Sequence, residues 1–301
     1  MNSAVTTSTT RRAGANGIEL AYDSFGERSR TPLLLVMGLG TQMIGWDDEF
    51  CAALAERGHW VVRFDNRDVG ESTRLDQLGV PDIGAMIQAS MAGQPVDAPY
   101  RLSDMADDAF GLLDALGADE AHVVGASMGG AIAQEMAMRR PARVRTLTSI
   151  MASSGAPNLP PPTAEALQML LTPTPTEYDA YLVRYRQTWR VLRGVGFPLD
   201  EARDEARAQR AYARGLSPAG TARQLAAIIA SGSRKAGLQT LHTPTLVIHG
   251  DADPLVPLAH GLDVAASVPG AKRLVIARMG HALPIGMWPQ IVDAIAAHAA
   301  P

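Results

Sequence analysis

The chain has 301 residues, of which 47% are hydrophobic, and a formal net charge of −4 at pH 7. This length allows one large hydrophobic core, or a core with a smaller lid. Charges of both signs are interspersed without a basic stripe, which argues against a nucleic-acid partner, and no apolar run is long enough to span a membrane.

The N-terminal segment, residues 1–15, is rich in Ser and Thr and is expected to form a mobile tail. It has no apolar stretch followed by a small-residue cleavage pattern, so it does not resemble a secretory signal. Cys51 is the single cysteine, so no internal disulfide can form. These features favour a globular cytoplasmic protein.

Short apolar runs then alternate with helical patterns, which is typical of β-α-β units and a mostly parallel sheet. Residues 18–22 alternate polar and apolar side chains and should form an antiparallel edge strand. Residues 32–37 and 60–64 are apolar throughout, as strands buried on both faces are. The other elements expected before residue 152 are a helix at 46–57, a helix at 102–116 with Ser103 as its N-cap, a strand at 121–125, a helix at 128–139 and a strand at 144–151.

The pattern changes between residues 154 and 235, where no buried strand is expected. Prolines separate helical segments there, at 164–171, 177–192, 200–213 and 220–231. Strand and helix patterns resume with a strand at 244–249, a helix at 258–267, a strand at 273–276 and a helix at 289–298. The sequence therefore predicts a core of residues 16–153 and 236–301, with residues 154–235 as a helical lid over the carboxyl ends of the strands, where open α/β sheets bind ligands.

The segment Gly125-Ala126-Ser127-Met128-Gly129 fits the pattern G-x-S-x-G, with a predicted strand before it and a helix after it. In that context the serine sits on a strained turn that lifts its hydroxyl out of the sheet, and small neighbours allow the chains to approach closely. The N-terminus of the following helix points free N–H groups at a developing oxyanion. The motif predicts Ser127 as a nucleophile.

A serine hydroxyl needs a base to activate it, and the base needs a carboxylate to orient it. Asp251 and Asp253 both follow the strand expected at 244–249, and His281 follows the last strand in a loop that begins with Gly280. This position distinguishes His281 from the other six histidines. Sequence position alone leaves either carboxylate as the acid.

These motifs make the chain resemble the α/β-hydrolase superfamily over nearly its whole length. Among its members the chain is most similar to serine esterases of the aclacinomycin methylesterase-like type, which act on anthracycline antibiotics. The resemblance implies a mostly parallel eight-stranded sheet flanked by helices, with a helical lid. The matching segments are 33–38 (LLLVMG), 46–50 (WDDEF), 63–68 (RFDNRD), 124–129 (VGASMG), the turn ending at 253–254 (DP) and 279–284 (MGHALP).

Carried over by position, the family's acid falls on Asp253, which leaves Asp251 a role in the turn. The oxyanion-hole donors fall on the backbone N–H groups of Met128 and Leu39. The segment 65–72 (DNRDVGES) resembles the family's D-x-R-G-x-G-x-S turn with Asp68 in place of the first Gly, and we interpret Asp68 as structural.

The predicted pocket is hydrophobic, because apolar and aromatic side chains occur in the catalytic loops and in the lid. Its expected lining residues are Met37, Met43, Trp46, Tyr185, Trp189 and Leu283. No spacing of ligands suggests a metal site and no Gly-rich phosphate loop occurs, so we expect neither a metal nor a cofactor. The expected partner is a small hydrophobic ester, without nucleic acid or membrane, and a homo-oligomer is compatible with the sequence.

These features predict a serine carboxylic ester hydrolase, acting on a small-to-medium hydrophobic ester through an acyl-enzyme. The same triad also serves lactonases, C–C bond hydrolases, thioesterases, perhydrolases and cofactor-free haloperoxidases, so these activities stay open. A slow-turnover receptor that binds its ligand with the same fold is a further alternative from a different class.

Overall fold

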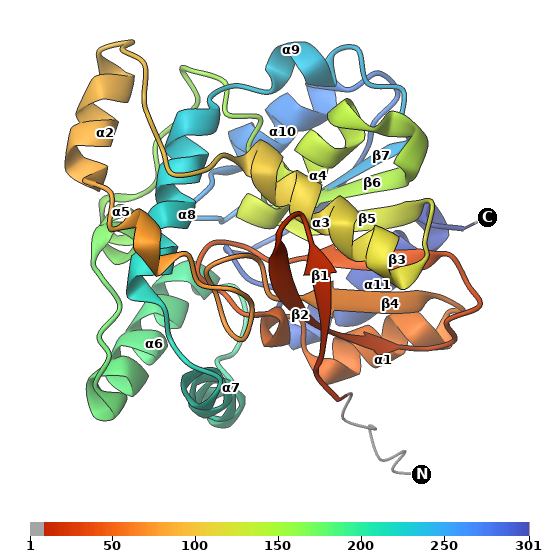
Figure 1. Ribbon diagram of the computed structural model, residues 1–301, viewed down its shortest axis with the longest axis horizontal. Coiled ribbons are helices and arrows are strands. Elements are labelled where there is room, and N and C mark those ends of the chain that lie inside the picture. Colours follow the sequence, from red (N-terminus) through yellow and green to blue (C-terminus); the bar gives the residue numbers. More distant parts are fainter. Residues whose placement is uncertain (1–8, 301) are drawn as a thin grey trace.

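A mixed sheet of eight strands forms the centre of the computed structural model, which describes residues 9–300 (Figure 1). Its strand order is β1-β2-β4-β3-β5-β6-β7-β8. β2 pairs antiparallel with both β1 and β4, and the remaining pairs are parallel. The strands are β1 (Arg11–Ala15), β2 (Ile18–Phe25), β3 (Pro32–Val36), β4 (Trp60–Phe64), β5 (Ala121–Ala126), β6 (Val144–Ile150), β7 (Thr245–Gly250) and β8 (Lys272–Ile276). The expected eight-stranded, mostly parallel sheet is confirmed.

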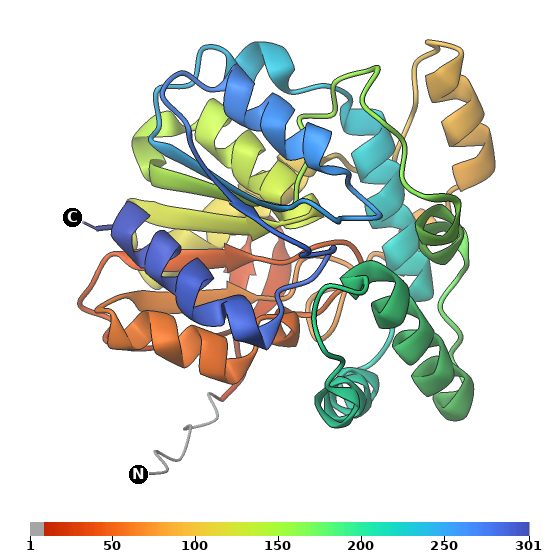
Figure 2. The same ribbon diagram turned by 180° about the vertical axis from the view of Figure 1, so that it is seen from behind.

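Helices cover both faces of this sheet, and a further group lies beyond one end of it (Figures 1 and 2). The α-helices are α1 (Asp48–Glu56), α2 (Ile83–Met91), α3 (Leu102–Leu116), α4 (Met128–Arg139), α5 (Ala164–Leu171), α6 (Tyr178–Arg193), α7 (Glu201–Ala213), α8 (Pro218–Ser231), α9 (Lys235–Leu238), α10 (Leu258–Ser267) and α11 (Trp288–His298). No helix within residues 9–300 is both long and apolar enough to cross a membrane.

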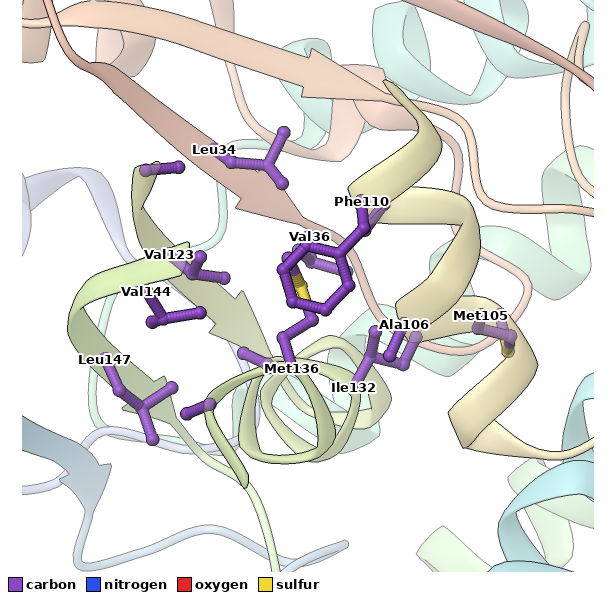
Figure 3. Close-up of a cluster of buried hydrophobic side chains, with 14 of the residues drawn as sticks. Leu34, Val36, Met105, Ala106, Phe110, Val123, Ile132, Met136, Val144 and Leu147 are labelled. Atoms are coloured by element: carbon purple, nitrogen blue, oxygen red, sulfur yellow. The ribbon is translucent and has the colours of Figure 1, made fainter. Parts of the chain in front are cut away.

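Two hydrophobic clusters sit on opposite faces of the sheet. The first joins the sheet to α3, α4 and α10, and Figure 3 shows Phe110 of α3 pointing toward Met136 of α4 and Val36 of β3. The second joins the sheet to α1 and α11. β3, β4 and β5 are buried along their whole length, because parallel central strands have helices on both faces. This packing fixes the strand ends that carry the site.

The N-terminal expectation is wrong for part of residues 1–15. Residues 11–15 form β1, which pairs with β2 through a hairpin, and residues 1–8 lie outside the described part of the chain. Asn16 and Gly17 both have positive φ (51° and 79°), as two-residue hairpin turns require. The dipeptide Asn-Gly is the signal for this hairpin in the sequence. The strand expected at 18–22 is therefore an inner strand rather than an edge strand.

Two details of the helices also differ from expectation. α3 begins at Leu102, so Arg101 is its N-cap and Ser103 lies inside the first turn. The Asp104 carboxylate accepts the Arg101 N–H at 2.7 Å, so Asp104 rather than Ser103 provides the side-chain hydrogen bond at the start of the helix. α2 has no counterpart in the sequence prediction; the Asp82 carboxylate caps it by accepting the Ala85 N–H.

The segment expected as a lid contains α5 to α8, within about three residues of the predicted bounds. Figures 1 and 2 place these helices, together with α2, at one end of the sheet. Arginines of α7 pair with carboxylates at the start of α1: Arg203 with Glu49, Arg207 with Asp47 and Arg210 with Asp48. Spacings of four and three residues place these arginines on one side of α7. This ionic contact docks the helical segment on the core.

Candidate active site

Ser127 lies on a sharp turn between β5 and α4, with φ of 56° and ψ of −123°. The flanking glycines are required by close contacts. A Cβ on Gly125 would lie 2.1 Å from the Gly129 carbonyl oxygen, and a Cβ on Gly129 would lie 2.1 Å from that of Val36. Positive φ strains a residue other than glycine, so packing of the strand and helix must hold the turn.

The side chains of Ser127, His281 and Asp253 form one chain of hydrogen bonds. His281 Nε2 lies 2.9 Å from Ser127 Oγ, and His281 Nδ1 lies 2.7 Å from Asp253 Oδ2. Because an ionised carboxylate only accepts, Nδ1 carries the proton and Nε2 is left as the acceptor for the serine hydroxyl. The structure therefore brings together the three residues that the sequence suggests.

Asp253 is held in place by its own turn. Its Oδ1 accepts the N–H groups of Leu255 and Val256 at 2.9 and 2.8 Å. Burial alone would raise the pKa of Asp253, but His281 and the Val256 N–H together hold this pKa below its usual value. The carboxylate is therefore ionised at neutral pH and can fix the tautomer of His281.

Asp251, the other carboxylate of this turn, has a different set of contacts. Its Oδ1 accepts the Arg278 N–H at 2.5 Å, and its own N–H donates to the Ile276 carbonyl. Arg278 has a φ of 63°, so Asp251 stabilises a tight turn shortly before His281. The geometry places Asp253 rather than Asp251 beside the imidazole.

The two expected oxyanion donors belong to segments that adjoin Ser127. Met128 is the first residue of α4, where backbone N–H groups have no acceptor within the helix. Leu39 follows Gly38, and a Cβ on Gly38 would lie 3.1 Å from the Ser127 Cβ. The loop is therefore packed directly against the serine.

Several contacts join the helical segment 154–235 to this region, and two of them are hydrogen bonds to the loops beside Ser127. The Gly40 N–H, one residue beyond Leu39, donates to Gln224 Oε1 of α8 at 2.8 Å. The His281 N–H donates to the Leu192 carbonyl at the end of α6 at 2.6 Å. These contacts tie the positions of the loop that carries Leu39 and of His281 to the helical segment 154–235.

A cavity of about 700 Å³ opens beside Ser127 and His281. Its volume is in the range of pockets that hold drug-sized ligands. Of the expected pocket residues, Met37, Tyr185 and Trp189 line it, and Leu39 lies beside them in the lining. Residues that the sequence analysis missed include Val80 and Ile83, at the start of α2, and Leu216 before α8. The available signals for the first two are Asp82, a residue type that often caps helices, and the apolar residues at helical spacing that follow it, Ile83 and Met86.

Three expected pocket residues do not line this cavity. Met43 is fully buried with Ile44 in a small apolar cluster, and Trp46 stacks on Phe50 with ring centroids 5.7 Å apart. Leu283 packs against the core cluster shared with α1 and α11. Each of them lies close in sequence to a catalytic loop, but its side chain faces the core. Within residues 9–300, no group of three or more His, Cys, Asp or Glu side chains could hold a metal ion.

Comparisons with known proteins match this chain to hydrolases of one fold family. A family model described as the alpha/beta hydrolase fold matches residues 31–286. Rhodomycin D methylesterase DauP of Streptomyces sp. (strain C5) is 33% identical, over 96% of this chain and 97% of that protein. The 2-hydroxymuconate semialdehyde hydrolase of Pseudomonas sp. (strain CF600) is 29% identical, over 87% of this chain and 82% of that protein.

Solved structures share the fold at lower identity. A membrane phospholipase A described as a bacterial virulence factor superposes with a TM-score of 0.75 at 20% identity, covering 98% of this chain and 86% of that one. The enol-lactonase from Burkholderia xenovorans LB400 gives 0.70 at 22% identity, covering 96% and 99%. At these identities the likeness concerns the fold alone.

Proposed function

Because the chain belongs to the alpha/beta hydrolase fold family, we propose that it is a serine carboxylic ester hydrolase with Ser127 as nucleophile, His281 as base and Asp253 as acid. The observation that carries this proposal is the unbroken hydrogen-bond chain from Ser127 Oγ to Asp253 Oδ2, which borders a cavity of about 700 Å³. Nucleophile and base within hydrogen-bond reach, with the base oriented by a third group, are the requirements for this chemistry.

The geometry supports a two-step reaction. Ser127 Oγ attacks the ester carbonyl carbon while His281 Nε2 takes the hydroxyl proton, and the Met128 and Leu39 N–H groups hold the oxyanion. The tetrahedral intermediate breaks its bond to the alkoxy oxygen, which leaves as the alcohol with the proton from His281. Water then attacks the acyl-enzyme and gives a proton to His281. His281 passes this proton to Ser127 Oγ as the bond to the acyl group breaks, and the acid is released.

The cavity suggests the class of ester. Its lining is mainly apolar and aromatic, which suits a hydrophobic group larger than a short acyl chain. The relatives at 33% identity are named for a methyl ester, that of rhodomycin D. We therefore infer methyl esters of bulky hydrophobic acids as the substrate class, with methanol as the leaving group.

A C–C bond hydrolase is the second candidate, favoured by the 2-hydroxymuconate semialdehyde hydrolase among the relatives. The deciding experiment is a turnover assay on p-nitrophenyl esters of graded length, methyl esters of polycyclic acids, a lactone and a ring-cleavage dienoate. We expect many turnovers on the esters, and none by Ser127→Ala. Cleavage of the dienoate in place of esters would favour the second candidate, and release of a single equivalent would indicate a binding protein.

A further inference from the structure

One side of α6 forms a wall of the cavity. The residues that line it recur at helical spacing: Tyr181, Arg184, Tyr185, Thr188, Trp189 and Leu192. Arg184 is the charged member of this stripe, whose other members are aromatic or aliphatic apart from Thr188. Arg184 is only partly buried, so its guanidinium stays accessible both to solvent and to a ligand in the cavity.

Arg184 has no ion pair with any carboxylate of residues 9–300. Its guanidinium donates to the carbonyl oxygens of Met169 at 2.6 Å and Thr172 at 3.2 Å, and Nη1 lies 3.0 Å from the Met169 sulfur. These acceptors at the end of α5 are all neutral. They hold the side chain in place and leave its charge unbalanced.

Neighbouring arginines of the lid differ in this respect. Arg193, on the same helix, pairs with Asp204 at 2.6 Å, and Arg186 pairs with Glu205 at 3.7 Å. Arg207 also lines the cavity, but Asp47 neutralises it through two short contacts. Burial lowers the pKa of Arg184, and no carboxylate there raises it. Besides Arg184, the described part of the chain contributes the charged side chains of Arg207 and Asp82 to the cavity lining, and Asp82 accepts the Ala85 N–H at the start of α2. Arg184 is thus a cavity-lining cation that forms no ion pair with a carboxylate of residues 9–300.

We propose that Arg184 binds an anionic oxygen of the substrate, a carboxylate, at the end of the cavity remote from the scissile ester. This inference rests on the proposed ester hydrolysis, which it deepens by naming an acidic group on the hydrophobic substrate. A carboxylate suits the site because the planar guanidinium fork binds it with two parallel hydrogen bonds.

The helix sets the approximate separation of the two groups. Leu192, whose carbonyl binds the His281 N–H, lies eight residues beyond Arg184 on the same helix. At 1.5 Å per residue this is roughly 12 Å along the axis. The preferred substrate therefore carries its carboxylate at a long distance from the ester, with an apolar segment between them along the aromatic stripe.

The test compares p-nitrophenyl monoesters of dicarboxylic acids of graded length with p-nitrophenyl esters of monocarboxylic acids of the same length. Wild type, Arg184→Met and Arg184→Lys are assayed, with the exposed Arg186→Met as the matched control. We expect Arg184→Met to lower the ratio of kcat/KM for charged over neutral esters about tenfold at the longer lengths, since a hydrogen bond to a charged group is lost. Arg184→Lys should keep part of the preference, and Arg186→Met should keep it entirely.

Two further outcomes separate this proposal from others. If Arg184 only caps α5, the variant loses activity on both esters equally and the ratio stays constant, which overturns the proposal. Binding of the free dicarboxylic and monocarboxylic acids to Ser127→Ala, measured by calorimetry, gives a readout independent of turnover. Tighter binding of the dicarboxylic acid than of the monocarboxylic acid, lost when Arg184→Met is added to Ser127→Ala, would support the subsite even if no ester were hydrolysed. Equal affinities of Ser127→Ala for the two acids would overturn it.

Discussion

Gln224 of α8 accepts the Gly40 N–H at 2.8 Å, so a lid side chain fixes the loop that carries the proposed oxyanion donor Leu39. The Gln224 amide nitrogen donates in turn to the Arg67 carbonyl at 2.7 Å, and the side chain is fully buried. Both ends of the amide are therefore satisfied, and the loop is held between the lid and the core.

Gln224→Ala should lower kcat on every ester by roughly ten- to a hundredfold, since a displaced donor stabilises the oxyanion poorly. The ratio of rates between short and long esters should stay constant, because the cavity lining is unchanged. Steady-state kinetics on p-nitrophenyl esters measure both quantities, with Gln209→Ala on the exposed side of α7 as control. A changed chain-length ratio with unchanged kcat would contradict this role.

Ser127→Ala should abolish turnover, with a loss of at least roughly a thousandfold in kcat, because no other group attacks the carbonyl. A fluorophosphonate should label the wild-type protein at Ser127 alone, as peptide mass spectrometry would reveal. The partly buried Ser153, which contacts His260, serves as the matched control. A label found on a different serine would contradict the assignment of Ser127 as the nucleophile.

Asp253→Asn should lower kcat by about four orders of magnitude, because the amide cannot hold His281 in the tautomer that activates serine. Asp251→Asn should weaken the turn at Arg278 and reduce stability, with a much smaller loss in kcat. Kinetics and thermal unfolding of both variants separate the two effects. Equal losses in kcat would mean that the carboxylates share one role.

Trp189→Ala and Tyr185→Ala should change the ratio of kcat/KM between long and short esters by about 1–3 kcal/mol, because each removes apolar contact area from the cavity. The rate on the shortest ester should change little. Val183→Ala, on the exposed side of α6, is the control. If both cavity variants keep the wild-type ratio, the substrate does not reach this wall.

Asp68→Asn should reduce the free energy of unfolding by about 2–4 kcal/mol, because it removes the buried carboxylate that faces Arg223 and leaves only the exposed Asp76, 3.0 Å away, as a counter-charge. Arg223 forms two hydrogen bonds with the Asp68 carboxylate, at 2.7 and 2.8 Å, and both side chains are fully buried. Urea unfolding measures the loss. An additional Arg223→Met substitution should restore part of the stability, which would not occur if Asp68 acted alone.

The same pair predicts a pH dependence. Burial would raise the pKa of Asp68, but Arg223, the Leu75 N–H and Tyr100 hold it below its usual value. A carboxyl group with a lower pKa in the folded protein stabilises the fold above its unfolded pKa, about 4, and loses this contribution as pH falls through the folded value. Stability of the wild type should therefore fall more steeply below pH 4 than that of Asp68→Asn.

Most of the fold could be predicted from sequence because its buried strands are short, apolar and bounded by turns. β4 and α5 have the predicted bounds. β1 was missed because its residues are mostly exposed and its composition is that of a tail. Asp68 was expected to be structural, and it forms a buried ion pair with Arg223, which is 155 residues away; nothing local in the sequence identifies such a pair.

The candidate site was predictable where motif and chain order determine position, as at Ser127 and His281, whereas Asp253 was preferred to Asp251 only through the family resemblance. Prediction failed where the direction of a side chain decides its role. Trp46 lies near the catalytic loops in sequence, yet its ring is buried against Phe50. The proposed role of Arg184 carries no signal in the sequence, because it depends on the three-dimensional surroundings of its guanidinium, where no carboxylate of residues 9–300 pairs with it.

The bond from the His281 N–H to the Leu192 carbonyl has a consequence for protein engineering. Helical lids look like exchangeable modules, and chimeras that swap them are an obvious way to transfer substrate range. In this chain, a graft that displaces the end of α6 also displaces the loop of the base. A successful chimera must therefore supply a carbonyl at that point, so the lid and the catalytic loop have to be transplanted or redesigned together.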